Sequence, residues 1–217
     1  MVEKDKYENF EDLKSNEPES LFDIVYKNHR SRILIFSPHA GGIEQGTSEI
    51  CVYIAGNTFS YYLFAGNGRD CKRLHITSNH FDEPILLRLL TEHQHAVSIH
   101  GMRNEMKHEA GADIFLGGLN RALIGITTKI LIDYHFETKN NFENPGSKLG
   151  GKDPANVTNK CMSGEGMQVE ISEDLRSQFF QGDFKKKTGR KETTEMFKKF
   201  CNAIVQSMTI FEKKNYN

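Results

Sequence analysis

Short apolar runs, each closed by glycine, serine or proline, recur along the chain. Residues 33–36 are four consecutive apolar residues followed by Ser37 and Pro38, a pattern typical of a strand buried on both faces. Runs of similar length and composition predict further strands, at residues 61–64, 73–77, 96–99, 113–116 and 167–171. The first 20 residues are acidic and carry little apolar periodicity, so we expect an N-terminal extension with a short helix at 10–13.

Helix signals lie between these runs. Hydroxyl residues at 47–48 resemble a helix start, Pro84 opens an amphipathic segment, and Ser172 caps a short helix. Longer helices are predicted at 120–133 and 190–211, and residues 138–164 read as one long loop. Strands that alternate with helices indicate an α/β fold. We expect one domain over residues 21–217, with a mainly parallel or mixed central sheet flanked by helices.

Composition narrows the class of function. The 217 residues include 28 basic and 29 acidic side chains, a net charge of −1, so no basic field favours nucleic acid. No apolar run approaches 18 residues, which argues against a membrane segment. The four cysteines form no CxxC pair, so we expect reduced thiols rather than a zinc ribbon. We expect a monomer that binds neither nucleic acid nor membrane.

Potential metal ligands follow successive predicted strands. In open α/β sheets, ligands bind at the carboxyl ends of the strands. His39, Glu44 and His100 make a plausible zinc shell that leaves one position for water, and Glu170 is then available as general base and acid. Each residue also has a structural explanation. A single strand-end histidine is more often a hydrogen-bonded structural residue, and Glu44 alone is typical of a first-turn carboxylate.

The sequence gives weaker support for a serine nucleophile, a phosphate-binding loop or a second metal site. The sequence holds no GxSxG elbow and no phosphate-binding glycine signature. A second metal at other histidines is conceivable, but no two of His75, His80, His93 and His95 share a ligand-like carboxylate at close spacing.

Several segments, in order, carry a resemblance to a known family. They are residues 38–49, 74–78, 81–84, 98–101, 115–118, 156–160 and 166–172. Together they resemble the poly-γ-glutamate hydrolases of Bacillus phages and prophages, over roughly residues 30 to 210. The resemblance implies a zinc amidohydrolase with a fold related to the carboxypeptidases, with His39, Glu44 and His100 as zinc ligands and Glu170 as the catalytic carboxylate. Conventional carboxypeptidases separate the first His and Glu by two residues, whereas four residues intervene here.

The resemblance also implies a substrate, the polyanion poly-γ-glutamate, whose α-carboxylates need cationic partners. Arg103 is the preferred one, three residues after His100, and the other candidates are Arg69, Arg73 and Arg121. Two alternatives stay open: a non-catalytic, phage-derived polyanion-binding or replication-associated protein, and a zinc deacylase acting on another amide. No secretory signal is visible, so we expect synthesis in the cytoplasm and release by lysis.

Overall fold

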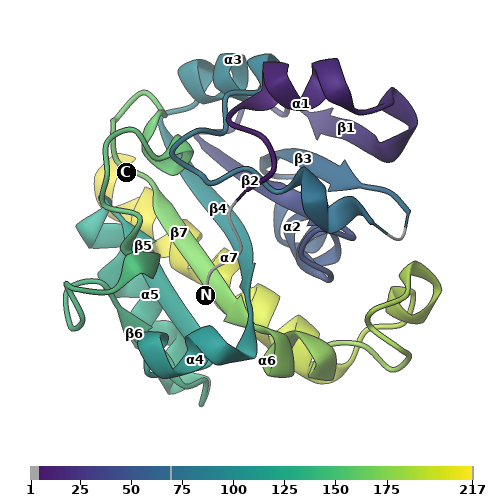
Figure 1. Ribbon diagram of the computed structural model, residues 1–217. Coiled ribbons are helices and arrows are strands. Elements are labelled where there is room, and N and C mark those ends of the chain that lie inside the picture. The colour runs from purple at the N-terminus through teal and green to yellow at the C-terminus, as the bar shows by residue number, and fades with distance from the viewer. Residues whose placement is uncertain (1–4, 69, 217) are drawn as a thin grey trace.

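A seven-stranded mixed sheet runs through the molecule (Figure 1), in the order β1-β3-β2-β4-β7-β5-β6. The computed structural model describes residues 5–68 and 70–216. The strands are Phe22–Lys27 (β1), Ile33–Gly41 (β2), Ser60–Gly66 (β3), His95–Met102 (β4), Ile114–Gly118 (β5), Thr138–Asn140 (β6) and Met167–Ser172 (β7). The β1–β3 and β5–β7 pairs are antiparallel and the other neighbours are parallel. The expected α/β class with a mixed sheet is therefore confirmed.

Helices cover both faces of this sheet (Figure 1). They are Phe10–Asn16 (α1), Thr47–Ala55 (α2), Pro84–Glu92 (α3), Asn104–Ala110 (α4), Arg121–Asp133 (α5), Glu173–Gln178 (α6) and Glu195–Tyr216 (α7). The larger core lies between the sheet and α2, α5 and α7, and a second core lies under α1 and α3 on the other face. Among the described residues, no helix has the length and apolar character needed to cross a membrane.

The two-residue period of the strands decides which face carries the polar residues. Ile99 and Val169 belong to the larger core, together with α2, α5 and α7. Successive side chains of a strand point to opposite faces, so His100 and Glu170 point to the face covered by α1 and α3. These two residues are register partners on β4 and β7, which places their side chains next to each other on that face.

Most of the predicted strands are confirmed, but the strand at 73–77 is wrong. Cys71–Leu74 is a short 3-10 helix, and residues 75–77 continue outside any strand. Within residues 5–68 and 70–216, no strand pairs with these residues. Their polar groups instead bond to side chains, as when the Thr77 N–H donates to Asp5. The last helix begins at Glu195 rather than at 190, and β1, β6 and α4 are not among the predicted elements.

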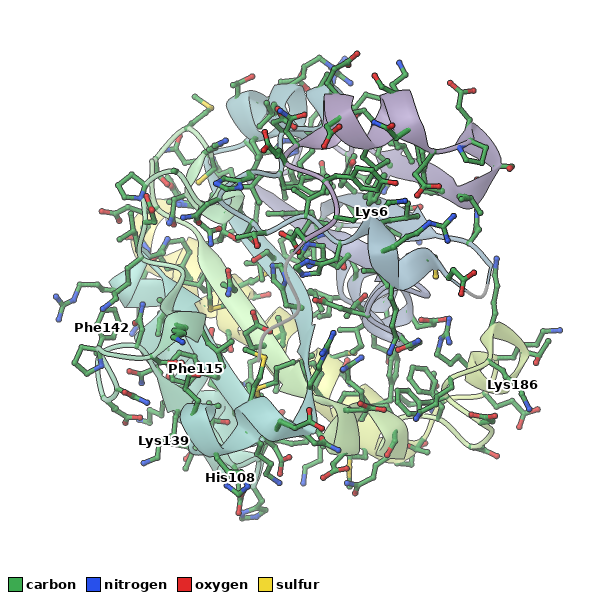
Figure 2. All side chains as sticks on the ribbon, viewed as in Figure 1. Lys6, His108, Phe115, Lys139, Phe142 and Lys186 are labelled. Carbon is green, nitrogen blue, oxygen red and sulfur yellow. The ribbon has the colours of Figure 1, made fainter. Side chains whose placement is uncertain are left out.

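The N-terminal segment packs onto the sheet through α1. Asn9 caps the helix by accepting a hydrogen bond from the Asp12 N–H, and Phe10 and Leu13 are buried in the second core. The helix expected at 10–13 is therefore present. Figure 2 shows Lys6 beside this segment, whereas Phe142 and Lys139 lie at the β6 side of the molecule.

A buried carboxylate fastens this segment to the domain. The Glu17 side chain is 4 % exposed and accepts hydrogen bonds from Arg73 Nε at 2.6 Å, Lys6 Nζ at 3.0 Å and the Tyr7 hydroxyl. The hydrogen bond from Arg73, together with those from Tyr7 and Lys6, outweighs burial and lowers the pKa of Glu17 from 4.5 to about 2. Ionised Glu17 therefore stabilises the fold.

Replacing Glu17 by glutamine is expected to lower the free energy of unfolding by about 2 kcal/mol at neutral pH, because the bonds to charged donors are weakened. A carboxyl whose pKa is depressed by folding contributes stability above its unfolded pKa, and the contribution disappears as pH falls through the folded pKa. The difference between wild type and Glu17→Gln should therefore shrink between pH 4.5 and about 2. Urea unfolding across that range measures it, with exposed Glu11→Gln as the control. An unchanged difference would contradict this assignment.

Candidate metal centre

An irregular end of β2 brings His39 and Glu44 together. The pairing of β2 with β3 shifts register between Ser37 and Ala40, so the strand departs from a regular ladder at His39. The chain then turns at Gly41, whose φ is +72°, and a Cβ there would lie 2.5 Å from the Gly66 carbonyl oxygen. Only glycine fits this approach. The Glu44 N–H closes the turn by donating to the His39 carbonyl oxygen at 2.9 Å.

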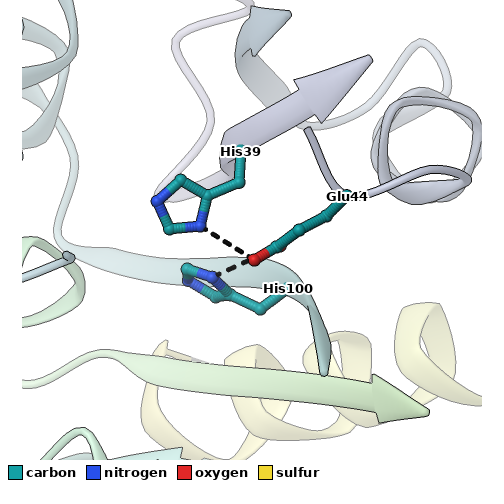
Figure 3. Close-up of side chains that lie close together, drawn as sticks. All are labelled: His39, Glu44 and His100. Atoms are coloured by element: carbon teal, nitrogen blue, oxygen red, sulfur yellow. Dashed lines mark hydrogen bonds and ion pairs between the residues drawn. The ribbon is translucent and has the colours of Figure 1, made fainter. Parts of the chain in front are cut away.

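Figure 3 shows the Glu44 carboxylate between the imidazoles of His39 and His100. Glu44 Oε1 lies 3.1 Å from His39 Nδ1, and Glu44 Oε2 lies 3.7 Å from His100 Nδ1. The Gly101 N–H fixes the carboxylate by donating to Oε2 at 2.8 Å. Both histidines are 2 % exposed. The carboxyl ends of β2 and β4 thus present three potential ligands in a buried group.

Burial and mutual charge set the ionisation of this group. Burial alone would raise the pKa of the Glu44 carboxyl, but the charge and hydrogen bond of His39, together with His100 and His75, lower it to about 2. Burial, aided by the charges of His39 and His75, lowers the pKa of His100 to about 3 despite the Glu44 charge. Glu44 is thus anionic and His100 neutral, as a divalent cation requires of these two ligands. For His39, burial is outweighed by the charge and hydrogen bond of Glu44, which raise its pKa.

The donor set fits zinc. A tetrahedral ion with bonds near 2.0–2.1 Å separates its donor atoms by about 3.3 Å. One donor atom each from His39, Glu44 and His100 lies within 4.8 Å of the others. The other ring nitrogens are also consistent with a metal site. His39 Nε2–H donates to the Ile76 carbonyl oxygen at 2.8 Å. His100 Nε2 is buried and has no hydrogen-bond partner among the described residues. Two imidazoles and one carboxylate leave a fourth position open, as catalytic zinc sites do.

Glu170 lies beside this group, on the neighbouring strand. It is 7 % exposed, is the register partner of His100, and accepts a hydrogen bond from Gln168 Nε2 at 2.8 Å. Burial and then the negative charge of Glu44 raise the pKa of Glu170 to about 8, against the opposing charges of His39 and Arg176. A carboxyl tuned close to neutral pH in a buried site is suited to general acid–base work.

A buried arginine joins the segments that carry these residues. Arg176, on α6, is 3 % exposed. Its guanidinium donates to three carbonyl oxygens: Gln45 at 2.5 Å, Ile171 at 3.1 Å and Met102 at 3.2 Å. These carbonyls lie one residue after Glu44, one after Glu170 and two after His100. A Cβ on Gly101 would lie 2.4 Å from Arg176 Cζ, so the absence of a side chain there makes room for the guanidinium.

The structure separates the substrate-binding candidates. Arg103 is exposed at the start of α4, directly after β4. Arg73 is bound to Glu17, and Arg121 lies over the Phe142 ring at 4.4 Å. Arg69 lies outside the described residues. Among the described candidates, Arg103 is the one that directly follows the strand carrying His100.

Sequence reasoning missed Arg176 and Gln168. Gln168 lies two residues before Glu170, on the same face of β7, so its position was readable from the strand period. Arg176 lies in a six-residue helix, and nothing in its sequence context marks it as buried.

The mixed sheet and the buried His–Glu–His group at its carboxyl edge define a class, that of α/β proteins with a candidate metal centre. The chain belongs to the poly-gamma-glutamate hydrolase family, whose model matches residues 7–203.

Two proteins of Bacillus subtilis strain 168 are similar to most of this chain. The SPbeta prophage-derived UPF0714 protein YoqZ is 39% identical over 181 residues, which are 83% of this chain. The chain spans 63% of the length of YoqZ. The UPF0714 protein YndL is 34% identical over 98% of this chain and 80% of its own length.

Solved structures match over nearly the whole chain. A bacteriophage poly-gamma-glutamate hydrolase is 33% identical and superposes with a TM-score of 0.90, covering 98% of this chain and all of that structure. The zinc-free apo structure of YndL is 32% identical, with a TM-score of 0.83, and covers 99% of this chain and all of that structure. The fold expected from the sequence is thus the fold of this family.

Proposed function

We propose that this protein hydrolyses the γ-glutamyl amide bonds of poly-γ-glutamate, with zinc bound by His39, Glu44 and His100 and with Glu170 as the catalytic carboxylate. The observation that carries the proposal is the pairing of a three-donor group with a buried carboxyl on the adjacent strand, in a chain of this family. A zinc ion held by these residues would lower the pKa of a bound water far below that of bulk water, to about 7, and would polarise the amide carbonyl.

Glu170 moves the proton in this scheme. One of its carboxylate oxygens accepts a proton from the attacking water as the water oxygen bonds to the amide carbon. The same proton then passes to the amide nitrogen as the carbon–nitrogen bond breaks, leaving a carboxylate and an amine. Gln168 holds Glu170 Oε1 through a hydrogen bond of 2.8 Å, so Oε2 is the oxygen available for this transfer.

Arg103 is proposed to bind an α-carboxylate of the polymer. Replacing it by alanine is expected to reduce kcat/KM on the polymer about 10- to 100-fold, mainly through KM, because a charge-assisted hydrogen bond is lost. Arg121→Ala, a surface arginine over Phe142, is the matched control. Steady-state kinetics on polymer of defined length measure the effect. Equal loss in both variants would indicate a general charge effect rather than a contact at position 103.

Zinc analysis combined with product sizing tests the proposed function. The purified protein is expected to hold one zinc per chain and to shorten poly-γ-glutamate, as followed by viscosity and size-exclusion chromatography. Zinc without shortening of the polymer, but with cleavage of another amide, would indicate a deacylase instead. Absence of both zinc and cleavage would indicate a non-catalytic polyanion-binding protein.

A further inference from the structure

Three consecutive residues after the 3-10 helix support one of the proposed zinc ligands. The His75 ring stacks on the His39 ring, with a centroid distance of 4.0 Å and an interplanar angle of 30°. The next carbonyl, that of Ile76, accepts the hydrogen bond from His39 Nε2–H at 2.8 Å. Because Nε2 carries the proton in this bond, Nδ1 is the nitrogen left to face Glu44 and an ion.

No strand pairing holds residues 75–77, so their position depends on other contacts. Asp5 supplies two of them from 70 residues away in the sequence. Its Oδ1 accepts from His75 Nδ1 at 2.7 Å, and its Oδ2 accepts from the Thr77 N–H at 2.6 Å. Both carboxylate oxygens are used, one at each end of the tripeptide, and the Ile76 carbonyl lies between them. The Asp5 side chain is 19 % exposed, so water competes only partly for these bonds.

The other two ligands are supported differently. Glu44 is held by the Gly101 N–H, a donor within β4. His100 extends from the middle of the sheet, between β2 and β7. Only His39 therefore depends on an irregular segment for the hydrogen bond that sets its ring orientation. Partners of this kind, which bond the second nitrogen of a ligating histidine, fix its tautomer and typically change metal affinity 10- to 100-fold when removed.

We propose that Asp5 is a positioning residue of the metal centre. It clamps His75 and Thr77, so that the Ile76 carbonyl stays in place to hold the Nε2–H tautomer of His39 and to direct Nδ1 toward the ion. The inference rests on the proposed metal centre, and it assigns to the N-terminal segment a role in that centre. Asp5 lies just before residues 7–203, which the family model matches.

Zinc affinity of the metal-free, full-length protein tests the proposal, measured by competition with a chromophoric chelator. Asp5→Asn and Asp5→Ala are expected to weaken zinc binding about 10- to 100-fold. Asp5→Glu, which keeps two acceptor oxygens, is expected to recover part of the loss. Glu8→Gln, an exposed carboxylate of the same segment, should bind zinc like wild type. At saturating zinc, kcat and KM of the Asp5 variants should return to wild-type values.

A second measurement separates positioning from simple tethering of the segment. Nitrogen-15 spectra of the histidine rings are expected to show His39 Nε2 protonated and hydrogen-bonded in the metal-free wild type, and to show this Nε2–H signal shifted and broadened in Asp5→Asn. If Asp5→Asn lowers stability in urea but binds zinc within twofold of wild type, the proposal is overturned. If the wild type itself binds no zinc, the proposed function fails first, and that result is distinguishable because every variant then behaves alike.

Discussion

Replacing Glu170 by glutamine is expected to reduce turnover of poly-γ-glutamate about 100- to 10 000-fold while zinc binding stays within about twofold of wild type. Glutamine keeps the shape and can still accept the hydrogen bond from Gln168, but it cannot take a proton from water. His39, Glu44 and His100 are unchanged, so the three donors stay in place. Single-turnover kinetics on polymer, together with zinc content, measure the two effects separately.

Glu165→Gln is the matched control, because it removes an exposed carboxylate five residues earlier in the chain. Its turnover is expected to equal that of wild type. A Glu170→Gln protein that hydrolyses the polymer at the wild-type rate would show that another group moves the proton. A Glu170→Gln protein that loses its zinc would instead assign Glu170 to the ligand shell.

Replacing His100 by alanine should weaken zinc binding about 100- to 1000-fold, because one of few ligands is lost from a site whose total binding free energy is about 10–16 kcal/mol. The protein as purified is expected to contain little zinc and to leave the polymer uncut. Wild-type protein treated with a chelator should behave in the same way and regain activity when zinc is returned. His108→Ala, an exposed histidine on α4, is the control and should keep both zinc and activity. Chelated wild-type protein that still shortens the polymer would rule out metal-dependent chemistry.

The central strands were predictable because each is buried on both faces. β2 begins with an uninterrupted apolar run, and β4 and β7 carry apolar residues interrupted by the polar residues of the site. β2, β4 and β7 all belong to this kind, and they carry the residues of the site. β1 was missed because it lies at the edge of the sheet and only Phe22 is buried in it. At residues 73–77 a strand was predicted where none forms. Apolar and polar residues alternate there as in a strand, but no sheet edge among the described residues pairs with them.

The candidate ligands could be predicted because the carboxyl ends of neighbouring strands converge. The residues that hold these ligands in place could not be predicted. Asp5 reaches His75 across 70 residues, and no local spacing marks a contact of that kind. The sequence analysis looked only for carboxylates shared by histidines at close spacing, so it could not find this partner of His75. The buried position of Arg176 could not be predicted for a related reason. Its three acceptors are backbone carbonyls, which every residue has.

The contact between Gly101 and Arg176 has a consequence for how this site can evolve. The guanidinium fills the volume that any side chain at position 101 would occupy. A methyl group introduced there must push the guanidinium off the carbonyls that follow Glu44, His100 and Glu170 at once. A mutational library should therefore return glycine at 101 whenever arginine is kept at 176, and should accept a larger residue only in clones that also carry a shorter one at 176.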